Sequence, residues 1–298
     1  MENPWRLEKV RLRSGLNVNL ARAGSGPLVV MLHGFPECWY SWRHQLRALA
    51  PSFQCVAPDL RGYGGTDAPR GVGNYALDRL VEDVVELIEA MGRRRAAVVG
   101  HDWGGAIAWA TALKRPEVVE RLVVMNCPHP AKFRAALIHN PRQMLRSWYI
   151  LFFQIPWLPD ALLRASGAAA VARALRETAV QKQAFSDEDL AYFRRAFRGT
   201  YSATAALNYY RSLFRSALLH PRRADAWIER KIEAPTMLVW GEQDVALGKE
   251  LTYGMEPLFA GRLELRYVPD SGHWVQQEKP QLVNRFLSRF LETPTYEV

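Results

Sequence analysis

The sequence is poor in cysteine and lacks any long apolar run. Its three cysteines, Cys38, Cys55 and Cys127, are widely separated and form no C-x-x-C pair. This pattern argues against a disulfide framework or a zinc site and is typical of free thiols in a reducing compartment. The longest aromatic and apolar stretch, residues 148–159, contains two prolines and is shorter than the ~20 residues that a membrane-spanning helix needs. The first residues contain no apolar segment of a signal peptide. We therefore expect a cytoplasmic protein without stable membrane insertion.

Acidic side chains are outnumbered by basic ones, and lysine is scarce beside arginine. The 39 Lys and Arg residues exceed the 30 Asp and Glu residues, which gives a formal net charge of +9. A basic balance can indicate nucleic-acid binding, but here the arginines are scattered apart from short clusters such as 93–95. Such clusters are usually solvated surface, so we expect no nucleic-acid partner. The chain is 49% hydrophobic and 11% aromatic, as is typical of a well-packed globular protein.

Apolar runs of strand character alternate with helical patterns along most of the chain. The predicted strands cover residues 8–12, 17–23, 28–32, 54–58, 96–99, 121–125, 236–240 and 263–268. Several of these runs are uninterrupted, which indicates strands buried on both faces of a parallel sheet. Helical periodicity covers residues 42–50, 78–91 and 280–291. This alternation predicts an α/β fold with a mostly parallel, eight-stranded sheet flanked by helices.

The strand pattern disappears between Pro128 and about Asp225. This stretch is rich in alanine and arginine, has helical character and is broken by several prolines and by Gly167. We therefore expect a helical cap over residues 129–224, inserted into a core that consists of residues 1–128 and 225–298.

An aspartate stands between two glycines at the junction of a predicted strand and helix. The spacing Gly100-x-Asp102-x-Gly104 is that of a nucleophile elbow, in which a strand turns sharply into a helix and presents the central side chain. Glycines at these two positions permit the strand and helix to approach closely. The alternative is a simple helix cap, because aspartate is also favoured there. The partners elsewhere in the chain must decide between the two.

Two further titratable residues follow predicted strands. Asp102, Asp244 and His273 occur in the order nucleophile, acid, histidine, which is the chain order of α/β-hydrolase triads. Taken singly, Asp244 is also explained as a helix cap and His273 as an ordinary loop histidine. All three at strand ends in this order predict a catalytic triad, which requires neither cofactor nor metal.

An aspartate nucleophile selects a different chemistry from serine. It displaces a leaving group at a saturated carbon and forms an alkyl ester, and it is already ionised at neutral pH. His273 is then free to activate a water that attacks the ester of Asp102, with Asp244 orienting the imidazole. The backbone N–H groups of Phe35 and Trp103 are placed to hold the resulting oxyanion. These residues point to hydrolysis of an epoxide or an alkyl halide and leave that choice open.

The leaving group distinguishes these two substrates. An epoxide oxygen needs an acid, and tyrosine suits this task because its phenol stays protonated at neutral pH. The predicted cap offers two candidates, Tyr149 before Phe152-Phe153-Gln154 and Tyr210 in Asn-Tyr-Tyr-Arg. Adjacent residues of a helix point ~100° apart, so only one of Tyr209 and Tyr210 can face Asp102.

Several motifs together resemble the α/β-hydrolase-fold epoxide hydrolases of the soluble type, without the phosphatase domain. They are His33-Gly34-Phe35-Pro36-Glu37, Trp39-Tyr40-Ser41-Trp42-Arg43, Asp59-Leu60-Arg61-Gly62-Tyr63-Gly64, Gly100-His101-Asp102-Trp103-Gly104-Gly105 and Gly272-His273-Trp274. The resemblance implies an α/β-hydrolase fold and the triad roles given above. It also implies that Tyr149 and Tyr210 protonate the epoxide oxygen, and that a cis peptide precedes Pro36. An apolar lining is expected from Phe35, Pro36, Trp103, Phe152, Phe153 and Trp274, which implies a hydrophobic epoxide as substrate.

Two alternatives remain open at this point, and so does the oligomeric state. Haloalkane dehalogenases share the fold, the nucleophile and the following tryptophan. Many of them use an asparagine where this chain has Phe35, and others recruit a cap tryptophan, for which Trp148 or Trp157 are candidates. Fluoroacetate dehalogenases carry arginine at the position of Trp103. The second alternative is a non-catalytic binding protein on the same scaffold, but such proteins commonly lose a triad member and none is missing here.

Overall fold

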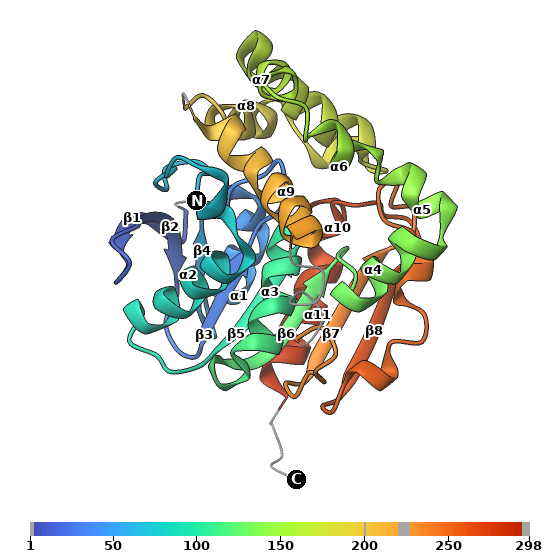
Figure 1. The fold of residues 1–298 in the computed structure, drawn as a ribbon. Coiled ribbons are helices and arrows are strands. Elements are labelled where there is room, and N and C mark those ends of the chain that lie inside the picture. Colours follow the sequence, from blue (N-terminus) through green and yellow to red (C-terminus); the bar gives the residue numbers. More distant parts are fainter. Residues whose placement is uncertain (1–2, 200, 220–226, 294–298) are drawn as a thin grey trace.

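An eight-stranded sheet forms the centre of the computed structural model, which describes residues 3–199, 201–219 and 227–293 (Figure 1). The strands are β1 (Trp5–Arg11), β2 (Asn17–Ala23), β3 (Leu28–Leu32), β4 (Gln54–Pro58), β5 (Ala96–His101), β6 (Val119–Met125), β7 (Thr236–Gly241) and β8 (Leu263–Val268). Their order is β1-β2-β4-β3-β5-β6-β7-β8, and pairing is parallel from β4 to β8, whereas β2 pairs antiparallel with both of its neighbours. The predicted mostly parallel sheet is confirmed.

Helices cover both faces of the sheet, which explains the uninterrupted apolar runs. Successive residues of a strand point to opposite faces. In β3, Val29 and Met31 pack with α1 (Arg43–Leu49) and α11 (Pro280–Glu292), whereas Val30 and Leu32 pack in the cluster that contains α2 (Leu77–Ala90) and α3 (Trp103–Lys114). Every residue of β3, β4, β5 and β7 is buried.

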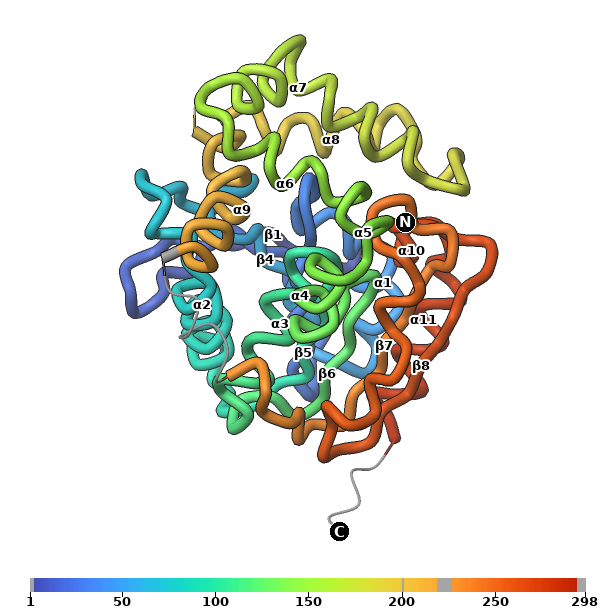
Figure 2. The backbone as a smooth tube through the Cα atoms, turned by 45° about the vertical axis from the view of Figure 1, so that its right-hand side comes forward, coloured from blue at the N-terminus to red at the C-terminus, as the bar shows by residue number. Residues whose placement is uncertain are grey.

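Among the described residues, six α-helices lie between β6 and β7, in the region predicted to be a cap. They are α4 (Pro130–His139), α5 (Pro141–Arg146), α6 (Trp148–Phe152), α7 (Leu158–Thr178), α8 (Asp187–Ala196) and α9 (Ser202–Leu219). Figures 1 and 2 show α6, α7 and α8 on one side of the sheet, with α9 leading back toward the core. The predicted return to the core at residue 225 lies outside the described residues.

Short helical segments complete the structure. The α-helix α10 (Val275–Glu278) precedes α11, and the 3-10 helices are η1 (Trp39–Trp42), η2 (Val72–Tyr75), η3 (Pro116–Val118), η4 (Lys182–Ala184), η5 (Lys249–Thr252) and η6 (Glu256–Leu258). The helix predicted over 42–50 is therefore split between η1 and α1. Within the described ranges, none of the helices combines the length and apolar character needed to cross a membrane.

Candidate active site

Asp102 lies in a sharp turn between β5 and α3. Its backbone adopts φ 49° and ψ −119°, a conformation that is uncommon for any residue except glycine. A Cβ atom on Gly100 would stand 2.2 Å from the carbonyl oxygen of Gly104, and one on Gly104 would stand 2.0 Å from that of Leu32. The glycines therefore permit the close approach that the elbow motif predicts. The Asp102 side chain makes no capping hydrogen bond to α3, so the simple cap does not explain it.

The loop after β3 reaches over the carboxylate of Asp102. The backbone N–H of Phe35 donates to Asp102 Oδ1 at 2.8 Å. Gly34 permits this contact, since a Cβ atom there would lie 2.5 Å from the Cβ of Asp102. The peptide between Phe35 and Pro36 is cis, as the resemblance implies. One of the two expected oxyanion donors is thus already aimed at an Asp102 oxygen, and the Trp103 amide begins α3 next to it.

His273 stands between the two aspartates. Its Nδ1 lies 2.7 Å from Asp244 Oδ2, and its Nε2 lies 3.6 Å from Asp102 Oδ2, longer than a normal hydrogen bond. Asp244 is buried and also accepts hydrogen bonds from the Asn126 side chain and from the backbone N–H groups of residues 246 and 247. The structure therefore brings the three predicted triad residues together, with Asp244 held on several sides.

The charges of this cluster favour a protonated imidazole in the free protein. Burial alone would lower the pKa of His273, but the carboxylates of Asp244 and Asp102 outweigh it and raise that pKa well above its usual range. Burial would raise the pKa of Asp244, whereas the His273 ring and its other hydrogen-bond donors lower it. A change in the charge of Asp102 must therefore alter the basicity of His273.

Tyr149, on α6, and Tyr210, on α9, meet close enough to Asp102 to interact with its charge. Their ring centroids are 5.8 Å apart, and the Tyr210 ring lies 5.0 Å from that of Trp103. Burial, reinforced by the negative charge of Asp102, raises the pKa of both phenols, so both stay protonated at neutral pH. Tyr209 points elsewhere, because its hydroxyl donates to the carbonyl oxygen of Arg61 at 2.7 Å. The choice of Tyr210 over its neighbour agrees with this geometry.

Aromatic side chains surround the two phenols. The Phe35 ring contacts those of Phe153, Tyr210 and Phe197 at centroid distances of 5.6, 5.5 and 6.4 Å. Phe152 meets this cluster through Phe153, at 5.9 Å. Sequence reasoning missed Phe197, which lies in no recognisable motif.

Two other predicted lining residues are Trp274, next to His273, and Pro36. Trp274 packs edge-on against the His273 ring at 4.7 Å and donates its indole N–H to Thr178 Oγ1, so it supports the base from the side. Pro36 is buried in the loop after β3. Trp274 therefore contacts His273 directly, in addition to its predicted place in the lining of the substrate site.

A buried network behind the site was not found from the sequence. His101 Nδ1 lies 2.8 Å from Glu37 Oε2, and its Nε2 lies 2.8 Å from the carbonyl oxygen of His273. Both ring nitrogens of His101 therefore face oxygen atoms. Glu37 also accepts the N–H of Gly34, and although burial opposes its ionisation, the His101 ring lowers its pKa to about 2. The network connects the loop after β3, residues 33–37, with the elbow at Asp102 and with the loop that carries His273.

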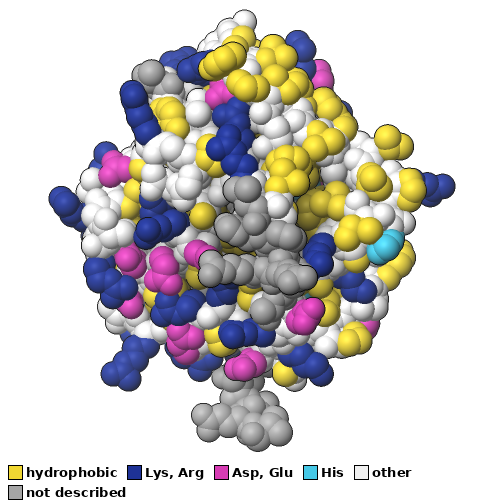
Figure 3. Space-filling model, viewed as in Figure 1, with side chains coloured by type: hydrophobic (Ala, Val, Ile, Leu, Met, Phe, Trp, Pro, Cys, Tyr) yellow, Lys and Arg dark blue, Asp and Glu magenta, His cyan; other side chains and the backbone are white. Residues whose placement is uncertain are grey.

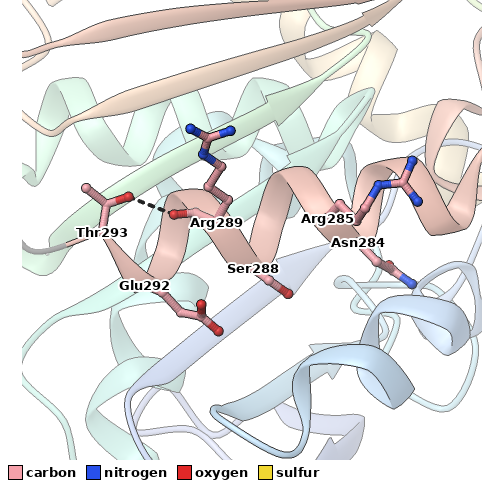
Figure 4. A pocket seen from close by; sticks show the side chains of 6 residues that line it. All are labelled: Asn284, Arg285, Ser288, Arg289, Glu292 and Thr293. Carbon is pink, nitrogen blue, oxygen red and sulfur yellow. Dashed lines mark hydrogen bonds between the residues drawn. The ribbon is translucent and has the colours of Figure 1, made fainter.

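A surface pocket on α11 is separate from this site. It is lined by Asn284, Arg285, Ser288, Arg289, Glu292 and Thr293, and the Thr293 hydroxyl donates to the carbonyl oxygen of Arg289 (Figure 4). None of the predicted site residues lines it. Asp102, by contrast, keeps 16% of its side-chain surface accessible within the aromatic cluster.

Comparisons with known proteins agree with this arrangement. The family model described as the alpha/beta hydrolase fold matches residues 27–280. Human epoxide hydrolase 4 is 35% identical to this chain over 293 residues, which are 96% of this chain and 79% of that protein. Mouse epoxide hydrolase 3 is 37% identical and covers 94% of this chain and 75% of its own length. A crystal structure of Bacillus megaterium epoxide hydrolase with an inhibitor is similar at a TM-score of 0.87 and 29% identity, over 96% of this chain and 100% of that chain. The chain therefore belongs to the epoxide hydrolases of the alpha/beta hydrolase fold.

Proposed function

We propose that this protein hydrolyses hydrophobic epoxides to vicinal diols through a covalent ester on Asp102. The observation that carries the proposal is the convergence of two phenols with raised pKa values, Tyr149 and Tyr210, close to the proposed nucleophile Asp102. A solved structure of the Bacillus megaterium relative contains a diol, which is described there as its product. The aromatic rings of Phe35 and Phe153 suit an apolar substituent on the epoxide.

The first step forms the ester. Asp102 Oδ2 attacks a ring carbon of the epoxide, the bond from that carbon to the ring oxygen breaks, and the oxygen takes a proton from one of the two tyrosines. The other phenol donates a hydrogen bond to the same oxygen. Oδ1 of Asp102 becomes the carbonyl oxygen of the ester while it still accepts the N–H of Phe35.

The second step releases the diol. Once Asp102 is esterified its negative charge is gone, so one of the two carboxylates that raise the pKa of His273 no longer acts, and the imidazolium loses its proton to solvent. His273 then takes a proton from water, and the hydroxide oxygen bonds to the Asp102 carboxyl carbon. The oxyanion on Oδ1 is held by the Phe35 amide and, we propose, the Trp103 amide. The ester bond breaks, the departing alkoxide takes the proton from His273, and the proton left on the Asp102 acid restores the tyrosine.

A single turnover in ¹⁸O-labelled water tests the covalent route. With enzyme in excess over styrene oxide, the first diol should carry unlabelled oxygen, and mass spectrometry of the peptide that contains Asp102 should show the label there. A labelled diol in the first turnover would mean that water attacks the epoxide directly, and would reject the ester intermediate.

The structure provides fewer hydrogen-bond donors for a halide leaving group than for an epoxide oxygen. The two cap tryptophans considered as halide donors, Trp148 and Trp157, are 61% and 83% exposed. The Trp103 side chain hydrogen-bonds to Tyr210, which occupies its N–H group. Incubation with 1-bromobutane should therefore release little bromide, and brisk release without turnover of styrene oxide would favour a dehalogenase instead.

A further inference from the structure

Exposed apolar side chains gather on one part of the cap. Of the fourteen large apolar side chains exposed among the described residues, nine lie within residues 138–162. We call the most exposed of them, together with their neighbours on α7, the cap apolar face: Leu145, Trp148, Leu151, Trp157, Leu158 and Leu162. Figure 3 shows hydrophobic side chains gathered over α5, α6 and α7, at the upper right of that view. Contiguous exposed apolar surface of this kind marks a contact site with a partner or a membrane.

The helix α6 carries both this face and the proposed active site. Tyr149 and Phe153 pack inward against Tyr210, whereas Trp148 and Leu151 are 61% and 62% exposed. The exposed and the inward-facing side chains are therefore on different sides of the same short helix. Whatever covers the cap apolar face lies one helix away from the site.

Positive charge predominates around the face, although Arg146 on α5 lies 3.9 Å from the exposed carboxylate of Glu250. Residues 130–170 contain Lys132, Arg134, Arg142, Arg146 and Arg164 but a single acidic residue. That residue, Asp160, is buried in an ion pair with Arg211, their closest atoms 2.6 Å apart. On α5, Arg142 and Arg146 stand three residues before and one residue after Leu145, so all three share one face of the helix.

The sign of this charge distinguishes between possible occupants. A second copy of the chain related by twofold symmetry would place the same cationic surface against itself. An anionic bilayer offers the opposite charge, and it also accepts leucine and tryptophan side chains at the level of its headgroups. We propose that the cap apolar face docks peripherally on a membrane that contains anionic phospholipid. This contact requires no spanning helix and does not depend on the proposed reaction.

Vesicle flotation tests the proposal directly. The full-length protein is mixed with vesicles of phosphatidylcholine alone, or of phosphatidylcholine with about one third phosphatidylglycerol, and the bound fraction is measured at low and high salt. We expect binding to the anionic vesicles, weaker binding to the neutral ones, and a decrease with salt. Each arginine near a charged membrane contributes roughly fivefold to partitioning. The double variant Arg142→Gln/Arg146→Gln should therefore bind roughly 25-fold more weakly.

The apolar contribution is tested separately. Leu145→Gln/Trp157→Asn removes two of the most exposed members of the face, which are 75% and 83% accessible. Asparagine is chosen because Trp157 has a φ of 61°, which asparagine tolerates. Binding should fall by roughly tenfold or more, with turnover of styrene oxide in vesicle-free buffer unchanged. Leu7→Gln and Arg94→Gln alter exposed residues outside the cap. They are the matched controls and should bind like the wild type.

Three results would overturn the proposal. The first is that the wild type does not float with anionic vesicles. The second is that Arg94→Gln lowers binding as much as the loss of each arginine of α5 does. The same conclusion follows if Leu145→Gln/Trp157→Asn binds like the wild type, because either result shows general adsorption of a basic protein. The third is a dimer in light scattering that Leu145→Gln/Trp157→Asn converts to monomers while vesicle binding is unchanged, which assigns the face to a second copy.

Discussion

At the scale of single residues, two neighbouring tyrosines have different surroundings. The Tyr210 ring contacts those of Trp103, Phe35 and Tyr149. Tyr209 contacts the ring of Tyr63, at 5.5 Å, and donates to a backbone carbonyl. Both rings contact Trp103, but only the Tyr209 hydroxyl is committed to a backbone carbonyl, so Tyr210 provides a test and Tyr209 its control on one helix.

Tyr210→Phe should slow the formation of the Asp102 ester. The variant loses one of the two proposed donors to the epoxide oxygen, and a general acid is worth roughly 10²–10⁴ in rate, less here because Tyr149 remains. Rapid quenching after mixing with styrene oxide, followed by mass spectrometry of the peptide that contains Asp102, measures ester formation. Tyr209→Phe keeps the donors and should leave that rate within about twofold of the wild type. Equal rates for both variants would reduce Tyr210 to a packing residue.

Hydrolysis of the ester should depend on the protonation of one histidine. His273 must be neutral to accept a proton from water, and its pKa is raised by Asp244 and, in the free protein, also by Asp102. The rate of ester hydrolysis should therefore rise with pH as His273 loses its proton and then reach a plateau. Esterification removes the charge of Asp102, so this rise should lie at lower pH than the titration of His273 in the free protein, measured by NMR. A rise at the same or a higher pH would argue against this coupling.

At the scale of elements, the elbow depends on glycines that leave no room for a side chain. A Cβ atom on Gly104 would meet the backbone of β3, which cannot move aside without disturbing the centre of the sheet. Gly73, in η2, is a suitable contrast because a Cβ atom there would meet no atom within 4 Å.

Gly104→Ala should lower the free energy of unfolding by about 3 kcal/mol or more, because α3 must shift away from β3 to admit the methyl group. Gly73→Ala should change it by less than about 0.5 kcal/mol. Urea denaturation followed by circular dichroism measures both. A Gly104→Ala variant as stable as the wild type would show that strand and helix tolerate a wider separation than the elbow implies.

The elements predicted from sequence are those whose signal is local. The strand β3 is recognisable because burial on both faces requires five apolar residues in succession. The elbow and the predicted triad are recognisable because Asp102, Asp244 and His273 each lie within five residues of the end of a strand. The Glu37–His101 pair was missed for the opposite reason, since the two residues are 64 positions apart and only the fold brings them together. The cap helices vary from the 5 residues of α6 to the 21 of α7, and α7 contains non-helical residues at 165–168, so no single periodic signal marks their bounds.

At the scale of the whole molecule, one carboxylate joins the cap to the histidine loop. Glu278 Oε2 accepts the backbone N–H groups of Val180 and Gln181 in the cap, both at 2.9 Å. Its Oε1 accepts those of Gly272 and Trp274, at 3.1 and 3.3 Å, on either side of His273. Glu278 is buried, and no local motif predicts contacts with residues almost a hundred positions away.

Glu278→Gln should weaken the hydrogen bonding of both the cap segment at residues 180–181 and the histidine loop at residues 272–274. Glutamine replaces one accepting oxygen with an NH₂ group that faces two N–H donors, which leaves buried amides unpaired at about 1–3 kcal/mol. Hydrogen exchange should accelerate at residues 180–181 and at 272–274 together. Ester hydrolysis should slow more than ester formation, because His273 acts in the second step only. Glu256→Gln, at an exposed glutamate, controls for the charge change. Faster exchange in the cap segment alone, with both half-reactions unchanged, would show that His273 is held in place without Glu278.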